Sequence, residues 1–260
     1  MITFISDLDS TLIYSQASNA LCVEKIEDRE ISYMTPKAYS HIQKLLTESN
    51  FQLIPCTARS YEQTMRISFL KQYQPSYMIC DLGASIYRNG VKDLTWEKEL
   101  LSKKILCPQK ISDFQSKVSS VAKVAYCRKI VSNNDYFLVF CFHNAEDAFN
   151  FYNHLQTYYK EEGLSFSISG RKIYCCPERL DKVLAVNHLQ ETMQPGITIT
   201  SGDSLLDFNF NQRGDLALLP GHAEFLIPHG FYSKSCGIEA GEDILSVLMN
   251  LTGFKDKETI

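Results

Sequence analysis

The sequence lacks the features that mark membrane, secreted and nucleic-acid-binding proteins. In its 260 residues no apolar run approaches the roughly 18–20 residues that a membrane-spanning helix requires. The first ten residues, MITFISDLDS, have neither the basic stretch nor the cleavage site of a secretory signal. The formal net charge is -4 and no long run of one sign occurs, so nothing indicates a nucleic-acid or membrane partner. We therefore expect a cytoplasmic protein.

Paired cysteines are also missing. The nine cysteines are an odd number, no Cys-x-x-Cys pair occurs, and most stand in apolar stretches, such as Cys141 in FLVFCF. This pattern predicts buried, reduced thiols rather than disulfides or a zinc site. Hydrophobic residues, by contrast, make up 45% of the chain and aromatic residues 12%. That supply is sufficient for the core of one large domain or two moderate ones.

Short apolar runs alternate with helical stretches toward both ends of the chain. The apolar runs begin near Ile2, Phe51, Tyr77, Gly196 and Asp215. Apolar residues recur at helical spacing in 35–50, 61–73 and 181–193, and Thr35 before Pro36 is typical of a helix start. Alternation of this kind predicts an α/β fold, a Rossmann-like parallel sheet with helices on both faces. Ligands of such sheets bind at the carboxyl ends of the strands.

The middle of the chain follows a different pattern. A helical stripe over 108–123 precedes two adjacent predicted strands, 124–131 and 135–142. Asn144 is placed to cap a second helix, and 164–169 with 171–176 read as a hairpin over Gly170. The order α-β-β-α-β-β predicts an inserted α+β domain at 88–176. The surrounding core is then 1–87 with 177–260.

Two carboxylates stand two residues apart at the end of the first predicted strand, in the stretch DLDSTL. Like charges this close repel each other, and a divalent cation removes the repulsion. Mg²⁺ prefers hard oxygen ligands, which Asp7, Asp203 and a backbone carbonyl near Asp9 can supply. The sequence therefore predicts a magnesium site at the carboxyl ends of the strands.

The same residues suit phosphoryl transfer. Asp7 is placed to attack phosphorus, and Asp9 to protonate the leaving oxygen and then activate water. Thr57 offers a hydroxyl to the phosphoryl oxygens, and Lys182 a positive charge. Arg59 fits either phosphate binding or a structural ion pair, and the sequence leaves both open.

These clusters resemble, in order, the motifs of the haloacid dehalogenase superfamily of phosphatases. The matching stretches are DLDST at 7–11, CTARS around Thr57, ERLDKVLAV around Lys182, and GDSLLD at 202–207. The insertion, and DLGASIYRNG before it, resemble the sugar-phosphatase branch of sucrose-phosphatase-like, mannosylphosphoglycerate-phosphatase-like and Cof-like enzymes. The resemblance implies an inserted cap, with Asp7 as nucleophile and Asp9 as acid/base. It also implies Thr57 and Lys182 as phosphate ligands, while Arg59 is a candidate only by its position two residues after Thr57.

The resemblance also completes the predicted metal set. Asp203 corresponds to the metal carboxylate and Asp207 to an acidic residue near the metal-bound waters, which gives Asp7, Asp9, Asp203 and Asp207 for Mg²⁺. Leu206 departs from the branch, which commonly has Asn before the last Asp. We expect the outer shell of the metal to differ here.

The predicted function is Mg²⁺-dependent hydrolysis of a small phosphorylated metabolite, in first place a sugar phosphate, through an aspartyl-phosphate. Two alternatives stay open: a phosphomutase using the same carboxylate pair, and a catalytically silent protein that binds a phosphorylated ligand. The polar stretch 14–34 has no clear period and is read as a flap beside the site without an assigned role. The sequence does not set the oligomeric state or the cap residues that select the substrate.

Overall fold

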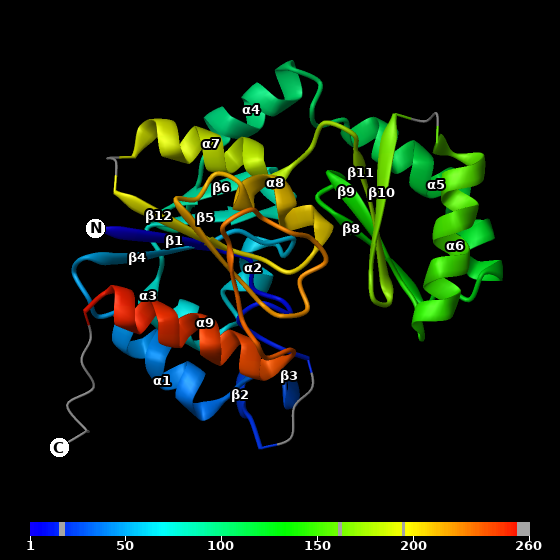
Figure 1. Cartoon of the computed structure of the whole chain (residues 1–260). Helices are drawn as coiled ribbons and strands as arrows, with labels where there is room; N and C mark the ends of the chain where they lie inside the picture. The colour runs from blue at the N-terminus through cyan, green and yellow to red at the C-terminus, as the bar shows by residue number, and fades with distance from the viewer. Residues whose placement is uncertain (16–18, 161–162, 194–195, 254–260) are drawn as a thin grey trace. The chain divides into compact units, whose positions relative to one another are not determined.

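The computed structural model describes residues 1–15, 19–160, 163–193 and 196–253, and the chain folds into two compact units (Figure 1). The first unit is Met1–Asp93 together with Lys182–Ile260, and the second is Leu94–Asp181. The predicted insertion at 88–176 overlaps the second unit, whose limits lie a few residues further along the chain. Its function as a cap stays a prediction.

A parallel five-stranded sheet forms the centre of the first unit, as predicted. Its strands lie in the order β14-β13-β12-β1-β4 and all neighbouring pairs are parallel. The bounds are β1 Ile2–Ser6, β4 Phe51–Pro55, β12 Ile197–Ser201, β13 Leu216–Leu219 and β14 Phe231–Tyr232. All five residues of β1 are buried, because helices cover both faces of the sheet.

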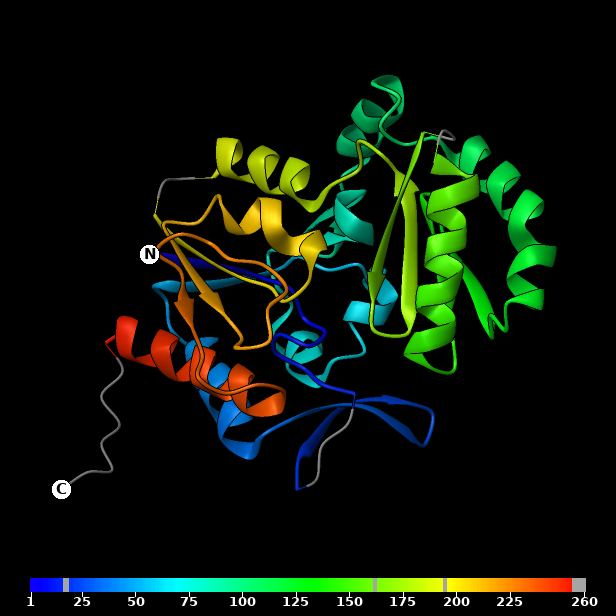
Figure 2. The same ribbon diagram turned by 45° about the vertical axis from the view of Figure 1, so that its right-hand side comes forward.

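Helices pack on both faces of this sheet (Figures 1 and 2). One face carries α1 (Pro36–Leu45) and α9 (Ile238–Leu251), and the other carries α7 (Lys182–Thr192) and the short α8 (Phe208–Asn211). The core on the α1 and α9 side unites side chains from the strands with those of both helices. Its members include Phe4, Leu53, Ile199, Ile42, Leu45, Ile244 and Leu248. Among the described residues no helix has both the length and the apolar character needed to cross a membrane.

The predicted start of the first helix is confirmed. Thr35 is the N-cap of α1 and its hydroxyl accepts a hydrogen bond of 3.0 Å from the backbone N–H of Ala38. Pro36 occupies the first turn, where its missing N–H would have had no helical partner. The Thr35 hydroxyl also donates to Glu242 of α9 at 2.6 Å, so the cap joins the two helices of this face.

The predicted helix over 61–73 is wrong as a single element. The structure has α2 (Tyr61–Thr64) and α3 (Ser68–Tyr73), separated by Ile67 in an extended conformation. Ile67 is fully buried, and the preceding Arg66 is bound to Glu24 at 3.0 Å. Tertiary contacts therefore hold the chain out of helical geometry at this point.

Two small antiparallel sheets complete the first unit. The stretch 14–34, to which no structure was assigned, contains a hairpin of β2 (Leu21–Ile26) and β3 (Arg29–Met34). The run after Tyr77 folds back on itself as β5 (Tyr77–Cys80), β6 (Ser85–Arg88) and β7 (Val91–Lys92). A parallel bridge between Cys56 and Ile79 continues the main sheet to β5.

The second unit is a four-stranded antiparallel sheet in the order β10-β11-β9-β8 with helices packed on it. Its elements are α4 Leu94–Ser102, α5 Pro108–Val124, β8 Lys129–Asn133, β9 Phe137–Cys141, α6 Ala145–Tyr158, β10 Leu164–Ser169 and β11 Lys172–Pro177. Asn144 caps α6, as predicted. The expected strand at 124–131 starts too early, because α5 extends to Val124 and Tyr126 takes a left-handed turn before β8. Sequence analysis did not identify α4.

The strand register brings three loops to one edge of the central sheet. Ser6, the last residue of β1, is paired with Pro55 of β4 and with Ser201 of β12. Since parallel strands end at the same edge, Asp7, Thr57 and Asp203 all follow within two residues of this row.

Replacing Thr35 by Ala tests the cap that joins α1 to α9. We expect the free energy of unfolding to fall by about 1 kcal/mol, within the roughly 0.5–2 kcal/mol typical of N-caps, because the N–H of Ala38 loses its acceptor. Urea denaturation measures the change. Thr47→Ala is the matched control, since the exposed Thr47 hydroxyl only donates to the backbone carbonyl of Lys44. Equal stability losses for the two variants would contradict the role of Thr35.

Candidate active site

A buried ammonium group joins two carboxylates at the carboxyl edge of the sheet. Asp7 directly follows β1, and Lys182 is the first residue of α7. Lys182 Nζ donates to Asp7 Oδ1 at 2.7 Å and to Asp207 Oδ1 at 2.6 Å. Burial lowers the pKa of Lys182, but the two carboxylates outweigh it and hold this pKa well above its ordinary value. Lys182 therefore stays charged although it is only 2% exposed.

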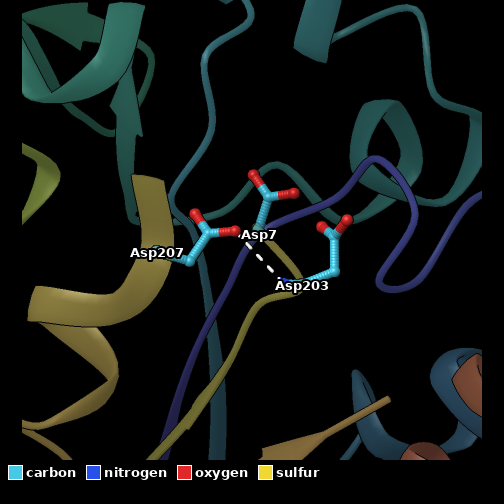
Figure 3. A group of neighbouring side chains, drawn as sticks. All are labelled: Asp7, Asp203 and Asp207. Carbon is cyan, nitrogen blue, oxygen red and sulfur yellow. Dashed lines mark hydrogen bonds between the residues drawn. The ribbon is translucent and has the colours of Figure 1, made fainter. Parts of the chain in front are cut away.

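Asp203 completes a group of three buried carboxylates (Figure 3). One oxygen from each of Asp7, Asp203 and Asp207 lies within 4.8 Å of the others. Burial and the neighbouring Asp7 and Asp207 raise the pKa of Asp203 to about 9. Burial also raises the pKa of Asp7 to about 7, with Asp207 and Asp9 adding to it against the opposing charge of Lys182. The single positive charge of Lys182 therefore does not neutralise the group when Asp7 and Asp203 are both ionised.

Asp207 fixes the loop that carries Asp203. Its Oδ2 accepts from the backbone N–H of Asp203 at 3.2 Å and of Ser204 at 3.1 Å, and from Ser204 Oγ at 3.0 Å. Because its Oδ1 is held by Lys182, donors already occupy both oxygens. Gly202 permits this arrangement, since a Cβ there would lie 2.7 Å from Asp207 Cγ.

The donor set of this group fits a hard divalent cation. Asp7 and Asp203 supply carboxylate oxygens whose raised pKa reflects the burial of like charges, a cost that a cation removes. Thr11 Oγ1 donates to Asp203 Oδ1 at 3.2 Å and so orients this carboxylate. The Asp9 carboxylate is not a member of the group. Its predicted contribution to the metal, through a backbone carbonyl, stays a prediction.

The Asp9 side chain is instead paired with Arg59. Arg59 Nε donates to Asp9 Oδ2 at 2.7 Å and Nη2 to Asp9 Oδ1 at 2.8 Å, a bidentate arrangement. Burial lowers the pKa of Arg59, but Asp9 and Glu24 outweigh it and raise this pKa above its ordinary value. Of the two roles considered for Arg59, the structure places it in an ion pair, and phosphate binding stays a prediction.

Thr57 is held in the loop after β4 by backbone hydrogen bonds. Its N–H donates to Ile79 O at 2.9 Å, and its carbonyl accepts from Leu82 N at 3.1 Å. The Thr57 hydroxyl oxygen accepts from the N–H of Arg59 at 3.2 Å. This oxygen is oriented by the backbone, which leaves the O–H hydrogen to serve as a donor.

A family model decides the class of the protein. The model described as sucrose-6F-phosphate phosphohydrolase matches residues 1–223, which include all four sequence clusters. The chain belongs to this family. It is a phosphoric monoester hydrolase of the sugar-phosphate phosphatase type, and the resemblance to haloacid dehalogenase phosphatases is confirmed. No curated protein matches the sequence significantly.

Solved structures show the same fold at low identity. Sucrose-phosphatase from Synechocystis sp. PCC6803, solved with sucrose and phosphate, is 19% identical with a TM-score of 0.60 over 97% of both chains. The C-terminal domain of trehalose-6-phosphate phosphatase from C. albicans is 15% identical, with a TM-score of 0.62 over 96% of this chain and 93% of that one. A haloacid dehalogenase-like hydrolase from Bacteroides thetaiotaomicron is 12% identical, with a TM-score of 0.58 over 95% and 98%.

Sequence reasoning missed several residues around the site of this phosphatase. Thr11, to which the sequence assigned no role, bonds to Asp203. His222 Nε2 is 2.8 Å from Ser10 O, and His222 Nδ1 accepts from the N–H of Gly237 at 3.2 Å. Glu24, in the unassigned stretch 14–34, reaches Arg59. The only available signal for Glu24 was an acidic residue directly after the apolar Val23, which predicts no partner.

Removing the titrating group at Asp203 tests the electrostatics of the metal-free site. The pKa of Asp203 is about 9 in the folded protein, above the ordinary 3.8, so the folded state binds the extra proton between these values. This contribution to stability is fully present below about pH 4 and is lost as the pH rises through about 9. We expect the stability of the wild type relative to Asp203→Asn to fall over this range in chelator, as followed by urea denaturation. A difference that is independent of pH would contradict the assignment.

Gly202→Ala tests the close approach of Asp207. The added Cβ would push Asp207 away from Lys182 and shift the loop of Asp203, and displacements near 1 Å lower enzyme rates by roughly 10²-fold. We expect phosphatase activity to fall by about that factor. Gly253→Ala is the control, because a Cβ added there meets no atom within 4 Å and only the left-handed φ of 78° strains the alanine, just after the end of α9. Equal activities of the two variants, both folded, would contradict the model of the site.

Proposed function

We propose that this chain hydrolyses the phosphate ester of a small sugar, with Mg²⁺ bound, through an aspartyl-phosphate on Asp7. The observation that carries the proposal is the setting of Asp7. This carboxylate lies at the end of a buried strand, with one oxygen bound by Lys182 at 2.7 Å, beside Asp203 and Asp207. A carboxylate in this position is fixed, partly dehydrated and adjacent to a cation site, as a nucleophile toward phosphorus requires.

The proposed reaction has two steps. Because Lys182 holds Oδ1 of Asp7, the other oxygen attacks phosphorus, and the bond between phosphorus and the sugar oxygen breaks as Asp9 gives that oxygen a proton. Water then attacks the phosphorus, its proton goes to Asp9, and the bond to Asp7 breaks to release phosphate. Lys182 and the hydroxyl of Thr57 donate to the phosphoryl oxygens as charge develops on them.

Asp7 and Asp203 are the residues that we propose to hold Mg²⁺, while Asp207 orients Asp203 and Lys182. The cation would neutralise the negative charge shared by the carboxylates and the phosphoryl group. Support comes from the hard-oxygen character of the three side chains and from the raised pKa of Asp7 and Asp203 in its absence. The departure at Leu206 does not remove any of these carboxylates.

A phosphorylated disaccharide or a related sugar phosphate is the proposed substrate class. The matching family is described by its action on sucrose-6F-phosphate, and the structural relatives include a sucrose-phosphatase and a trehalose-6-phosphate phosphatase. The second unit, Leu94–Asp181, is proposed to correspond to the specificity-determining cap that the sequence predicts.

Phosphate release from a panel of sugar phosphates, phosphorylated disaccharides, nucleotides and an aryl phosphate tests the proposal. We expect release to require Mg²⁺, to stop in chelator, and to fall by roughly 10³-fold or more in Asp7→Asn, because the nucleophile is lost. Asp215→Asn is the matched control. It is the same change on the same sheet, where Asp215 bonds to the N–H of Thr198 at the opposite end of β12.

Each alternative gives a different result in this panel. Release that survives in Asp7→Asn would contradict the assigned nucleophile. An isomeric sugar phosphate formed without net phosphate release would indicate a phosphomutase. Bound Mg²⁺ with no turnover of any compound would favour a protein that only binds a phosphorylated ligand.

A further inference from the structure

The hairpin of β2 and β3 carries a buried carboxylate that the proposed mechanism does not use. Val23 and Glu24 are consecutive in β2, yet both are buried, whereas successive side chains of a regular strand point to opposite faces of the sheet. The pairing explains this. Cys22 is paired with Tyr33 and Glu24 with Ser32, so Val23 is an extra residue that forms a β-bulge. The bulge turns Glu24 to the buried side, as bulges near active sites often do.

Glu24 is bound by three side chains from different segments. Its Oε2 accepts from Ser32 Oγ at 2.7 Å and from Arg59 Nη1 at 2.8 Å, and its Oε1 accepts from Arg66 Nε at 3.0 Å. The side chain of Glu24 is fully buried. Burial alone would raise the pKa of Glu24, but Arg59, Ser32 and Arg66 outweigh it and lower this pKa. The carboxylate is therefore a fixed negative charge inside the unit.

Arg59 connects this buried charge to Asp9. The guanidinium is planar, and its Nε and Nη2 face Asp9 while Nη1 faces Glu24. Ser32 Oγ also accepts from Nη2 at 3.3 Å. Side-chain exposure rises along the chain of contacts, from 0% at Glu24 through 12% at Arg59 to 47% at Asp9. The anchored end is buried, and the end that faces solvent is the carboxylate.

We propose that Glu24 is a positioning residue for Asp9, acting through Arg59. A long arginine side chain has many rotamers, and the contact with Glu24 selects the one in which the guanidinium presents two donors to Asp9. Asp9 is thereby held as an oriented carboxylate, the form that must accept a proton from water when the phosphoryl bond to Asp7 breaks. The inference rests on the proposed function, in which Asp9 is the acid/base.

Glu24→Gln and an aryl phosphate with an electron-poor leaving group test this role. Such a leaving group departs without a proton from Asp9, so kcat/KM reports only the attack by Asp7 on phosphorus. Hydrolysis of the phosphorylated enzyme comes after that step. If this hydrolysis becomes slow, kcat falls and kcat/KM does not. We expect kcat to fall about tenfold in Glu24→Gln, part of the roughly 10²–10⁴-fold that a positioned acid/base contributes. We expect kcat/KM to change by less than about threefold, with a burst of one leaving group per enzyme in rapid mixing.

The path through Arg59 is tested by a double variant. If Glu24 acts only by holding Arg59, Glu24→Gln adds little to the loss in kcat already caused by Arg59→Gln. Independent, multiplying losses would overturn the proposed path. Glu30→Gln is the control in the same hairpin, because the ion pair of Glu30 with Lys25 is largely exposed, and it is expected to leave both constants unchanged.

Asp9→Asn separates this inference from the function on which it rests. If Asp9→Asn lacks the selective loss of kcat, the acid/base assignment itself fails. If Asp9→Asn shows the selective loss of kcat and folded Glu24→Gln does not, only the role of Glu24 is overturned. A parallel fall of kcat and kcat/KM in Glu24→Gln would also overturn it. Should Glu24→Gln not fold, Ser32→Ala replaces it, because this change removes one donor to Glu24. We then expect kcat to fall about twofold to threefold while kcat/KM stays unchanged. Absence of this fall would count against the proposal.

Discussion

The contact of the Lys182 ammonium with Asp7 and Asp207 is the interaction on which the arrangement of the site depends. It joins the first strand of the chain to a helix that starts more than 170 residues later, and to the loop after β12. Three carboxylates within 4.8 Å of one another would repel strongly without a cation. One lysine compensates for part of this charge, and burial together with the remaining charge of Asp7 and Asp207 raises the pKa of Asp203. The same imbalance is the physical basis for the divalent cation that we propose at this site.

The central sheet and its carboxylate cluster could be predicted because both follow from local patterns and one topological rule. The apolar runs of β1, β4 and β12 are short and bounded by polar residues, and the connections between parallel strands must be helical crossovers. Once the strands are parallel, their carboxyl ends share an edge. Asp7, Thr57 and Asp203 then lie at this edge whatever the remaining details of the chain.

The contacts that hold Asp9 and Arg59 could not be predicted, because they depend on the tertiary positions of single residues. Nothing local in the sequence indicates that Val23 forms a bulge, yet this extra residue decides whether Glu24 faces the interior. In the same way, the break between α2 and α3 follows from the burial of Ile67 and the bond from Arg66 to Glu24. Helical spacing persists across the break and so conceals it. The sequence position of Arg59 is compatible with both an ion pair and phosphate binding, because it does not identify the partner of the guanidinium.

Two carboxylates from one Asp-x-Asp motif are thus held in opposite ways, although only Leu8 separates them. The fully buried Leu8 fixes the backbone between them. Asp7 shares its cation, Lys182, with another buried carboxylate and keeps an elevated pKa of about 7. Asp9 receives both donors of one edge of a guanidinium that Glu24 holds in place. In a covalent mechanism these two residues need different freedom, since one forms and breaks a bond to phosphorus while the other only exchanges protons. The contact between Glu24 and Arg59 fixes the hairpin of β2 and β3 to the loop after β4. A hairpin without this contact would not hold the guanidinium that binds Asp9.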